Sequence, residues 1–168
     1  MVKAQNNYSY PMEESKILEI RKFLSGKKGT SGGSLDFFAV EGTPILAAAS
    51  GEVILVKDIS QGDNVITIKD AATVIIKHQN GENSRYMNLK PGEILVSEGK
   101  SVEVGEMIGF CYSSNGEPSI HFEVFKFTKE NPNLDKDFEC LEVSFNETPR
   151  EEAEEGPEVN RKRHHRTL

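Results

Sequence analysis

The chain has 168 residues, 36% of them hydrophobic, which suits one domain of ordinary size around a single core, together with tails. Its formal net charge of −7 argues against a nucleic-acid-binding surface, because such surfaces carry an excess of basic side chains. No apolar run approaches the length of a membrane span, and residues 1–8 lack the apolar segment of a secretory signal, so a cytoplasmic location is the default expectation.

The first predicted element is an amphipathic helix over residues 12–24, which Gly26 can cap. Five apolar side chains fall broadly on one side of this helix: Met12, Ile17, Ile20, Phe23 and Leu24. We therefore expect residues 1–28 to form an N-terminal segment ahead of the main domain.

Short runs rich in valine, isoleucine and phenylalanine follow from residue 35 onward, separated by Gly, Asn and Asp turns. The clearest predicted strands are residues 52–57, 64–69, 73–78 and 120–127. Residues 62–64 and 79–82 fit hairpin turns. Many short strands at close spacing predict a mainly β domain over residues 29–145, built as an antiparallel β-sandwich or a partly open barrel.

The strand pattern ends after Phe145. Residues 147–158 are rich in glutamate and contain two prolines, and residues 161–166 form a basic end. A segment of this composition cannot bury enough apolar surface to offset the entropy of ordering it. We therefore predict a disordered, charged tail over residues 146–168.

The most informative motif lies in residues 118–124, Pro-Ser-Ile-His-Phe-Glu-Val. Its polar and apolar residues alternate as they do in a half-buried strand. Ser119 and His121 are two residues apart, so both side chains leave the same face of that strand. Two histidines at these positions would hold a metal or share a proton transfer, but here one of them is a serine.

Five segments in chain order resemble the motifs of the M23 (LytM and lysostaphin-like) peptidase family, and together they span residues 29–127. Residues 35–37 resemble the end of "HxxxDF", 42–54 "GTPVxAxxxGxV", 75–89 "vxIxHxnG…tYxHL", 98–109 "v.kGq.VkkGq.IG" and 121–123 the close of "HLHFE". The resemblance implies the duplicated hybrid motif fold, a β-sandwich with a groove across one sheet. It also implies a zinc metalloendopeptidase ancestry, in a family that usually acts on the cell wall outside the cytoplasm.

The same resemblance implies where the zinc centre of the family would fall. The three ligand positions fall on Gly32, Asp36 and His121, and the two histidines that handle protons fall on Asn88 and Ser119. Glycine has no donor atom in its side chain, and asparagine and serine are poor bases near neutral pH. Two of three ligand positions remain suitable, and neither proton-handling histidine is present.

Other side chains could in principle replace the missing ligand. His78 matches a family histidine that is not a ligand, and we expect a half-exposed strand residue there. Cys111 could donate a thiolate, although buried strand cysteines usually pack, and the sequence leaves open whether it pairs with Cys140. His164 and His165 lie in the tail as a weak chelating pair. We therefore expect no stably bound zinc.

Asp36 and His121 also have an interpretation without metal. A carboxylate that faces an imidazole can form a charge-assisted hydrogen bond. Glu123 lies on the same predicted strand face as His121 and could be its partner instead. Tyr86, which matches the tyrosine of the family motif, is expected to pack in the core or to form a groove wall.

These features favour a degenerate M23 peptidase-like domain without zinc hydrolase activity, which acts as a binding, regulatory or scaffolding module. Its partner would be an unknown protein or a peptidoglycan-type peptide. The alternative is an active zinc metalloendopeptidase that cleaves peptidoglycan-type or glycine-rich peptides with a non-standard ligand set. A related carrier or phosphoryl-transfer domain would need a reactive lysine hairpin or a pair of active-site histidines, and neither is found.

Overall fold

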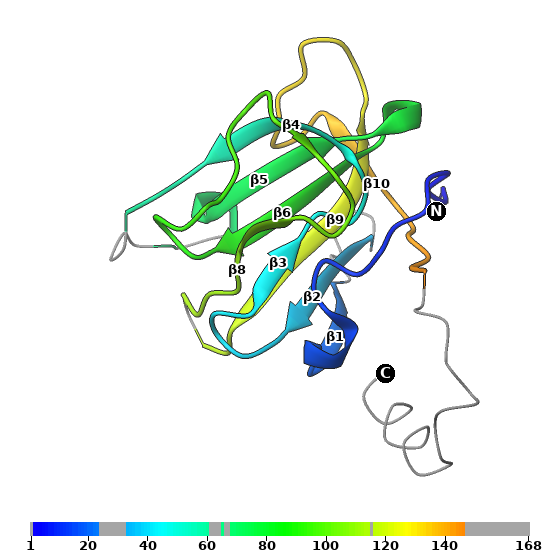
Figure 1. Ribbon diagram of the computed structural model, residues 1–168. Helices are drawn as coiled ribbons and strands as arrows, with labels where there is room; N and C mark the ends of the chain where they lie inside the picture. Colours follow the sequence, from blue (N-terminus) through cyan, green and yellow to red (C-terminus); the bar gives the residue numbers. More distant parts are fainter. Residues whose placement is uncertain (1, 24–32, 61–64, 66–67, 115, 147–168) are drawn as a thin grey trace, which may run out of the picture.

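A computed structural model of the chain describes residues 2–23, 33–60, 65, 68–114 and 116–146, which form two antiparallel sheets (Figure 1). The strands are β1 (Glu19–Phe23), β2 (Ser34–Phe38), β3 (Pro44–Leu46), β4 (Gly51–Lys57), β5 (Ala72–Lys77), β6 (Asn83–Leu89), β7 (Ser101–Val102), β8 (Met107–Phe110), β9 (Ser119–Phe127) and β10 (Phe138–Leu141). Short 3-10 helices are η1 (Glu14–Lys16), η2 (Ile68–Asp70) and η3 (Gln79–Gly81). No helix in these ranges is long and apolar enough to cross a bilayer.

The large sheet has the strand order β1-β2-β9-β6-β5-β4-β7, and β10 also pairs with β9. The long strand β9 makes this possible, because β2 pairs with its first half and β10 with its second half. The sheet is not a closed barrel, and the small sheet consists of β3 and β8. The predicted mainly antiparallel β fold is therefore confirmed.

Side-chain alternation along β9 separates two faces of the large sheet. Ile120 and Phe122 are fully buried and point to the inner face, which packs on the core. Ser119 and His121 are only partly buried and point to the opposite, outer face. The predicted placement of Ser119 and His121 on one face is thus explained by the period of two in a strand.

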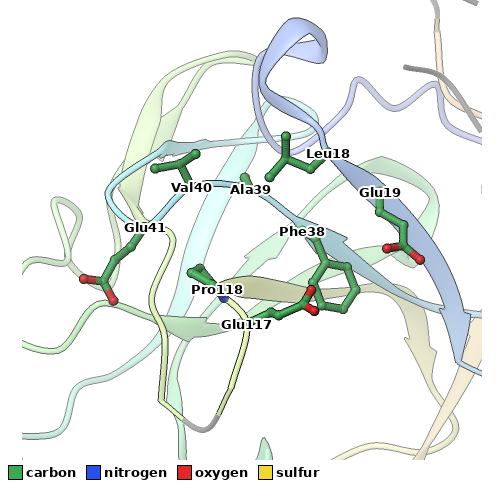
Figure 2. A pocket seen from close by; sticks show the side chains of 8 residues that line it. All are labelled: Leu18, Glu19, Phe38, Ala39, Val40, Glu41, Glu117 and Pro118. Atoms are coloured by element: carbon green, nitrogen blue, oxygen red, sulfur yellow. The ribbon is translucent and has the colours of Figure 1, made fainter. Parts of the chain in front are cut away.

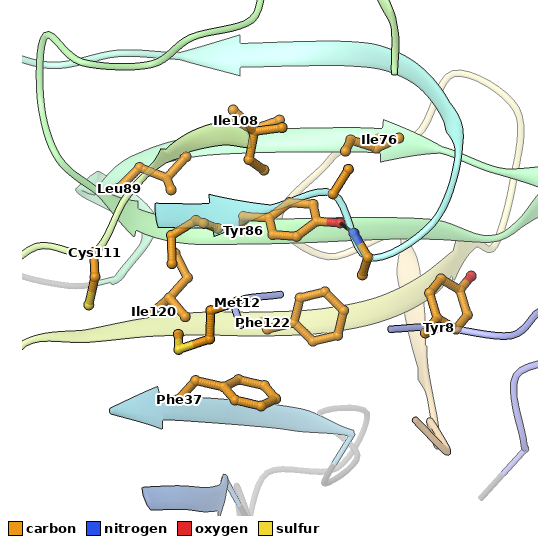
Figure 3. Close-up of a cluster of buried hydrophobic side chains, with 14 of the residues drawn as sticks. Tyr8, Met12, Phe37, Ile76, Tyr86, Leu89, Ile108, Cys111, Ile120 and Phe122 are labelled. Carbon is orange, nitrogen blue, oxygen red and sulfur yellow. Dashed lines mark hydrogen bonds between the residues drawn. The ribbon is translucent and has the colours of Figure 1, made fainter. Parts of the chain in front are cut away.

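The hydrophobic core fills the space between the inner face and the small sheet (Figure 3). Ile45 of β3 and Ile108 of β8 pack toward Phe37, Tyr86 and Phe122 of the large sheet, and all five are fully buried. Complete burial of a large apolar side chain stabilises a fold by roughly 1.5–3 kcal/mol. This shared core holds the strands that carry the candidate site in a fixed register.

The predicted helix over residues 12–24 is wrong except for one turn. The chain forms the short helix η1 and then β1, which pairs antiparallel with β2 along its whole length. Met12 and Ile17 are buried in the core. The apolar spacing that would fit one side of a helix therefore occurs here in an irregular segment and a strand. Long-range pairing with β2 overrides the local periodicity. Leu24 and Gly26 lie outside the described residues.

Three of the four predicted strands, 52–57, 73–78 and 120–127, correspond to β4, β5 and β9 to within one residue. The turn at 79–82 joins β5 to β6 as a hairpin, with φ of +61° at Asn80 and +69° at Gly81. The fourth predicted strand, 64–69, is wrong at its end, where η2 begins at Ile68. The predicted turn at 62–64 and the predicted tail over 147–168 lie outside the described residues, and the domain limits remain a prediction.

Residues 2–9 form an extended segment, the N-terminal strap, that closes one end of the core. Backbone hydrogen bonds of 2.8 Å join it to the C-terminal segment, from Ala4 N–H to Glu142 O and from Asn146 N–H to Tyr8 O. Its tightest side-chain anchor is Glu82, a fully buried carboxylate in the β5–β6 hairpin. Glu82 accepts hydrogen bonds from the backbone of Gln5 and Asn6 and from the hydroxyl of Tyr8.

Candidate functional site

Asp36 and His121 face each other across neighbouring strands on the outer face. They are paired residues of β2 and β9, and His121 Nδ1 lies 2.7 Å from Asp36 Oδ1. The side chains are 28% and 12% exposed, so the pair is screened from solvent on most sides. This is the geometry that the metal-free interpretation requires.

The donor set on the described residues does not fit a catalytic zinc. Such a centre needs about three protein ligands and an open position for water. Within the described ranges, no group of three His, Cys, Asp or Glu side chains is placed to hold a metal ion. The remaining family position, Gly32, lies outside those ranges and has no side chain to donate.

Asn88 occupies the position of a proton-handling histidine, but its side chain holds the backbone together. It is an extra residue in β6, because Leu89 pairs with Ala72 and Met87 with Thr73. Its φ is +77°, a conformation that asparagine tolerates better than most residues. Both amide hydrogens are used, since Nδ2 donates to the carbonyl oxygens of Tyr112 and Ser119, each at 2.9 Å.

Ser119 lies at the start of β9, next to this asparagine. Its backbone carbonyl accepts from Asn88, and its backbone pairs with Phe38 of β2 and bridges to Tyr112. The structure therefore brings Asn88, Ser119, His121 and Asp36 together, as the motif positions predict. These residues are hydrogen-bonded within the sheet. Neither proton-handling position, Asn88 or Ser119, carries a strong base.

Glu123 is bound to Arg85 and not to His121. Arg85 Nε lies 3.3 Å from Glu123 Oε1, and both side chains are less than a tenth exposed. The guanidinium carbon lies 4.3 Å from the ring centre of Phe125 and 4.5 Å from that of Phe138. Cys140 Sγ donates to Glu123 Oε2 at 3.0 Å, and burial together with the Glu123 charge raises the pKa of that thiol.

Sequence reasoning missed this cluster. Arg85 is an unusual residue for a buried strand, and its place opposite Glu123 follows from the pairing of β6 with β9. Arg85 Nη1 donates to the carbonyl of Leu134, while Nη2 finds no hydrogen bond within the described part of the chain. In the sequence, Arg85 precedes the tyrosine of the "tYxHL" segment and Glu123 closes the "HLHFE" segment, but neither position indicates the other as its partner.

Tyr86 lies on the inner face and is fully buried, so the groove-wall alternative is wrong and the packing alternative holds (Figure 3). Its hydroxyl accepts a hydrogen bond of 2.8 Å from the backbone N–H of Ala48. Burial raises the pKa of Tyr86 to about 12. The residue therefore joins the core to the segment before β4 and does not contact a ligand on the outer face.

His78 is also a structural residue, but it is buried and not half-exposed as expected. Its Nδ1 lies 2.7 Å from the carbonyl oxygen of Ser50 and its Nε2 lies 2.7 Å from Ser84 Oγ. Burial lowers the pKa of His78, more strongly than the contact with Ser50 and the charge of Glu82 raise it. The neutral ring donates through Nδ1 and accepts through Nε2.

Both cysteines are buried, and no disulfide joins them. Cys111 packs in the core, and burial raises its pKa to about 11. A thiol of this kind remains protonated at neutral pH and is a poor metal ligand. Neither cysteine supplies the missing donor beside Asp36.

Comparisons with known proteins agree with this geometry. A sequence model of peptidase family M23 matches residues 30–134. The cell division protein DipM of Caulobacter vibrioides (strain NA1000 / CB15N) is 31% identical over 103 residues, which cover 59% of this chain and 15% of DipM. The chain thus corresponds to a small part of the length of that relative.

Two solved structures share the fold. A zinc-containing peptidase from Vibrio cholerae superposes with a TM-score of 0.54 at 24% identity, over 71% of this chain and 36% of that chain. A chain of the SpoIIQ–SpoIIIAH pore-forming complex superposes with a TM-score of 0.53 at 18% identity, over 82% of this chain and 89% of that chain. At these identities the likeness establishes the fold alone.

Proposed function

The chain belongs to peptidase family M23, and from this premise we propose that it is a non-hydrolytic member that binds or scaffolds a partner. The observation that supports the proposal is the direct hydrogen bond between Asp36 and His121. The two remaining ligand side chains bind each other, and the third ligand position is a glycine.

The proton chemistry supports the same conclusion. Hydrolysis by a zinc peptidase needs a metal-bound water and a group that moves protons to and from the peptide. Asn88 cannot accept a proton near neutral pH, and both of its amide hydrogens are bound to backbone carbonyls.

The relatives indicate the kind of role. DipM is a cell division protein, and the same fold occurs in a chain of a pore-forming complex. Both descriptions suit a domain that recognises a partner in an assembly. We propose that the partner is a protein or a peptidoglycan-type peptide in a cell-wall setting, and that the domain regulates or scaffolds it without cutting it.

Metal content tests this proposal directly. Purified protein, dialysed and then measured for metal, should hold well under one zinc per chain, and it should not cleave peptidoglycan or glycine-rich peptides. The alternative, an active zinc metalloendopeptidase with a non-standard ligand set, requires stoichiometric zinc that survives dialysis. It also requires cleavage that a chelator and His121→Ala both abolish, and that combination would overturn the proposal.

A restoration variant tests how much of the site remains. Gly32→His, Asn88→His and Ser119→His together supply the missing imidazoles of the family pattern. The matched control adds His121→Ala to these changes, so it keeps the same loops but lacks one ligand. Zinc binding that depends on His121 would show that the lost side chains alone explain the lost metal.

A further inference from the structure

A hollow of about 380 Å³ opens at the β1 edge of the large sheet (Figure 2). We call it the edge pocket. Its apolar lining comes chiefly from Leu18, Phe38 and Val40, and its acidic lining from Glu19, Glu41 and Glu117. It lies where β1 begins, where β2 ends and just before β9 begins.

The apolar side chains around the edge pocket are unusually exposed. Leu18 is 64% and Val40 is 67% exposed, although both are large aliphatic residues. The ring of Phe38, also in this lining, lies 4.4 Å from the guanidinium carbon of Arg21. Exposed apolar side chains gathered at a hollow typically mark a surface that another chain segment covers.

The charged lining of the edge pocket is entirely acidic. Glu19 is bound to Arg21, with Oε2 2.6 Å from Nε, and Glu41 accepts a hydrogen bond from the backbone N–H of Ser113. The charge of the third carboxylate, Glu117, acts on the guanidinium of Arg21. The pocket therefore suits side chains with an aliphatic stem and a cationic head, which are lysine and arginine.

We propose that the edge pocket is occupied by the chain's own basic end, residues 161–166. This segment, Arg-Lys-Arg-His-His-Arg, is the densest group of cations in the sequence. The glutamate-rich residues 147–158 that precede it are repelled by the same acidic lining. Charge thus selects the last part of the chain and not the part next to the domain.

The position of the last described residues makes the contact reachable. The ring of Phe145 lies 5.8 Å from that of Phe37, the residue next to Phe38 in β2. Phe37 and Phe38 point to opposite faces, so the chain must pass around β1, the edge strand beside β2. Two strand spacings are about 10 Å, and a flexible linker of about 14 residues spans roughly 20 Å on average.

Tethering compensates for weak ion pairs. An exposed salt bridge contributes only about 0–1 kcal/mol, but a short flexible linker gives an effective concentration in the millimolar range. The basic end then acts as an internal ligand that a basic segment of a partner has to displace. This inference does not depend on the proposed absence of hydrolysis, because no residue that lines the pocket occupies a ligand or proton-handling position of the family motif.

Paramagnetic relaxation in the full chain tests the contact. A nitroxide attached to Thr167→Cys should broaden the backbone amide signals of Leu18, Ala39 and Val40 far more than those of β4, at the other end of the sheet. The native thiols are buried, and wild-type protein exposed to the same reagent checks that they remain unlabelled. Equal broadening at both ends of the sheet would overturn the proposal.

Charge variants identify the cause. Glu117→Gln should weaken the contact roughly two- to five-fold, as expected for one exposed ion pair. Glu52→Gln, the same change at an exposed position of β4, should leave the contact unaltered. Equal effects of the two variants would show nonspecific attraction and would also overturn the proposal.

A mixing experiment separates the chain's own tail from that of a second copy. Nitroxide-labelled protein at natural isotope abundance is mixed with ¹⁵N-enriched protein that carries no nitroxide. If the contact is intramolecular, the ¹⁵N signals of Leu18 and Val40 remain sharp. Broadening in the mixture would assign the pocket to the tail of another copy and would contradict an intramolecular occupant.

Discussion

Asn88 stands where the family motif has a proton-handling histidine, and its side chain has a structural role in this chain. An imidazole at this position would have to point toward substrate, whereas the amide of Asn88 points to two carbonyl groups that flank the start of β9. The backbone at this bulge is left-handed, a conformation that asparagine tolerates well. The motif identifies the position, but only the contacts reveal its present role.

Substitution of Asn88 separates these two contributions. Asn88→Ala should lower the free energy of unfolding by about 2–3 kcal/mol, since it removes two hydrogen bonds and places alanine at a positive φ. Asn88→Gly, which keeps the conformation without strain, should cost about 1–2 kcal/mol. Urea denaturation of both variants measures the difference. Two near-neutral variants would contradict the structural role of this side chain.

The residue scale is also where sequence reasoning was most effective. Side-chain identity alone decides which donors exist, so Gly32, Asn88 and Ser119 could be recognised as departures from the family motif without coordinates. The partner of His121 could not, because Asp36 and Glu123 both lie on the outer face. The pairing of β6 with β9 commits Glu123 to Arg85 and leaves Asp36 opposite His121.

At the scale of elements, the N-terminal residues form parts that no local pattern indicated. The segment predicted as a helix supplies the edge strand β1, and residues 2–9 form the N-terminal strap. Both depend on partners distant in sequence, namely β2, Glu82 and the C-terminal segment. Apolar spacing over a dozen residues cannot distinguish a helix from a strand whose partner has not yet been placed.

Tyr8→Phe tests the strap. The change removes one hydrogen bond to the buried Glu82 carboxylate and should lower the free energy of unfolding by about 1.5–3 kcal/mol. Amide hydrogen exchange should accelerate at Ala4 and Asn146, which bond across the strap, before it changes in β6. Tyr112→Phe is the matched control. Unchanged exchange at the strap would contradict an anchoring role for Tyr8.

At the scale of the whole molecule, His78 joins segments that are far apart in the chain. It binds Ser50 before β4 and Ser84 in β6, and its ring lies 5.5 Å from that of Tyr8 in the N-terminal strap. Burial by these segments lowers the pKa of the imidazole. Protonation of His78 therefore destabilises the whole fold and not one local element.

The sign of the resulting pH dependence follows from the lowered pKa of His78. Between the folded and unfolded pKa values the unfolded chain binds more protons, so this contribution to stability is complete above the unfolded value of about 6.5 and is lost as pH falls below it. Urea denaturation at about pH 7.5 and about pH 5.5 should show a larger loss for wild type than for His78→Gln. Equal losses would contradict the burial effect.

The sequence by itself determined the family, the mainly β architecture and the absence of three family histidines, because these follow from motif identity and from periodicity along the chain. The tertiary structure decided that residues 19–23 form a strand, that His78 is buried, that no disulfide joins the two cysteines and that Asp36 binds His121. Each of these depends on contacts between residues distant in sequence. Such contacts are set by strand register and core packing, which no local pattern contains.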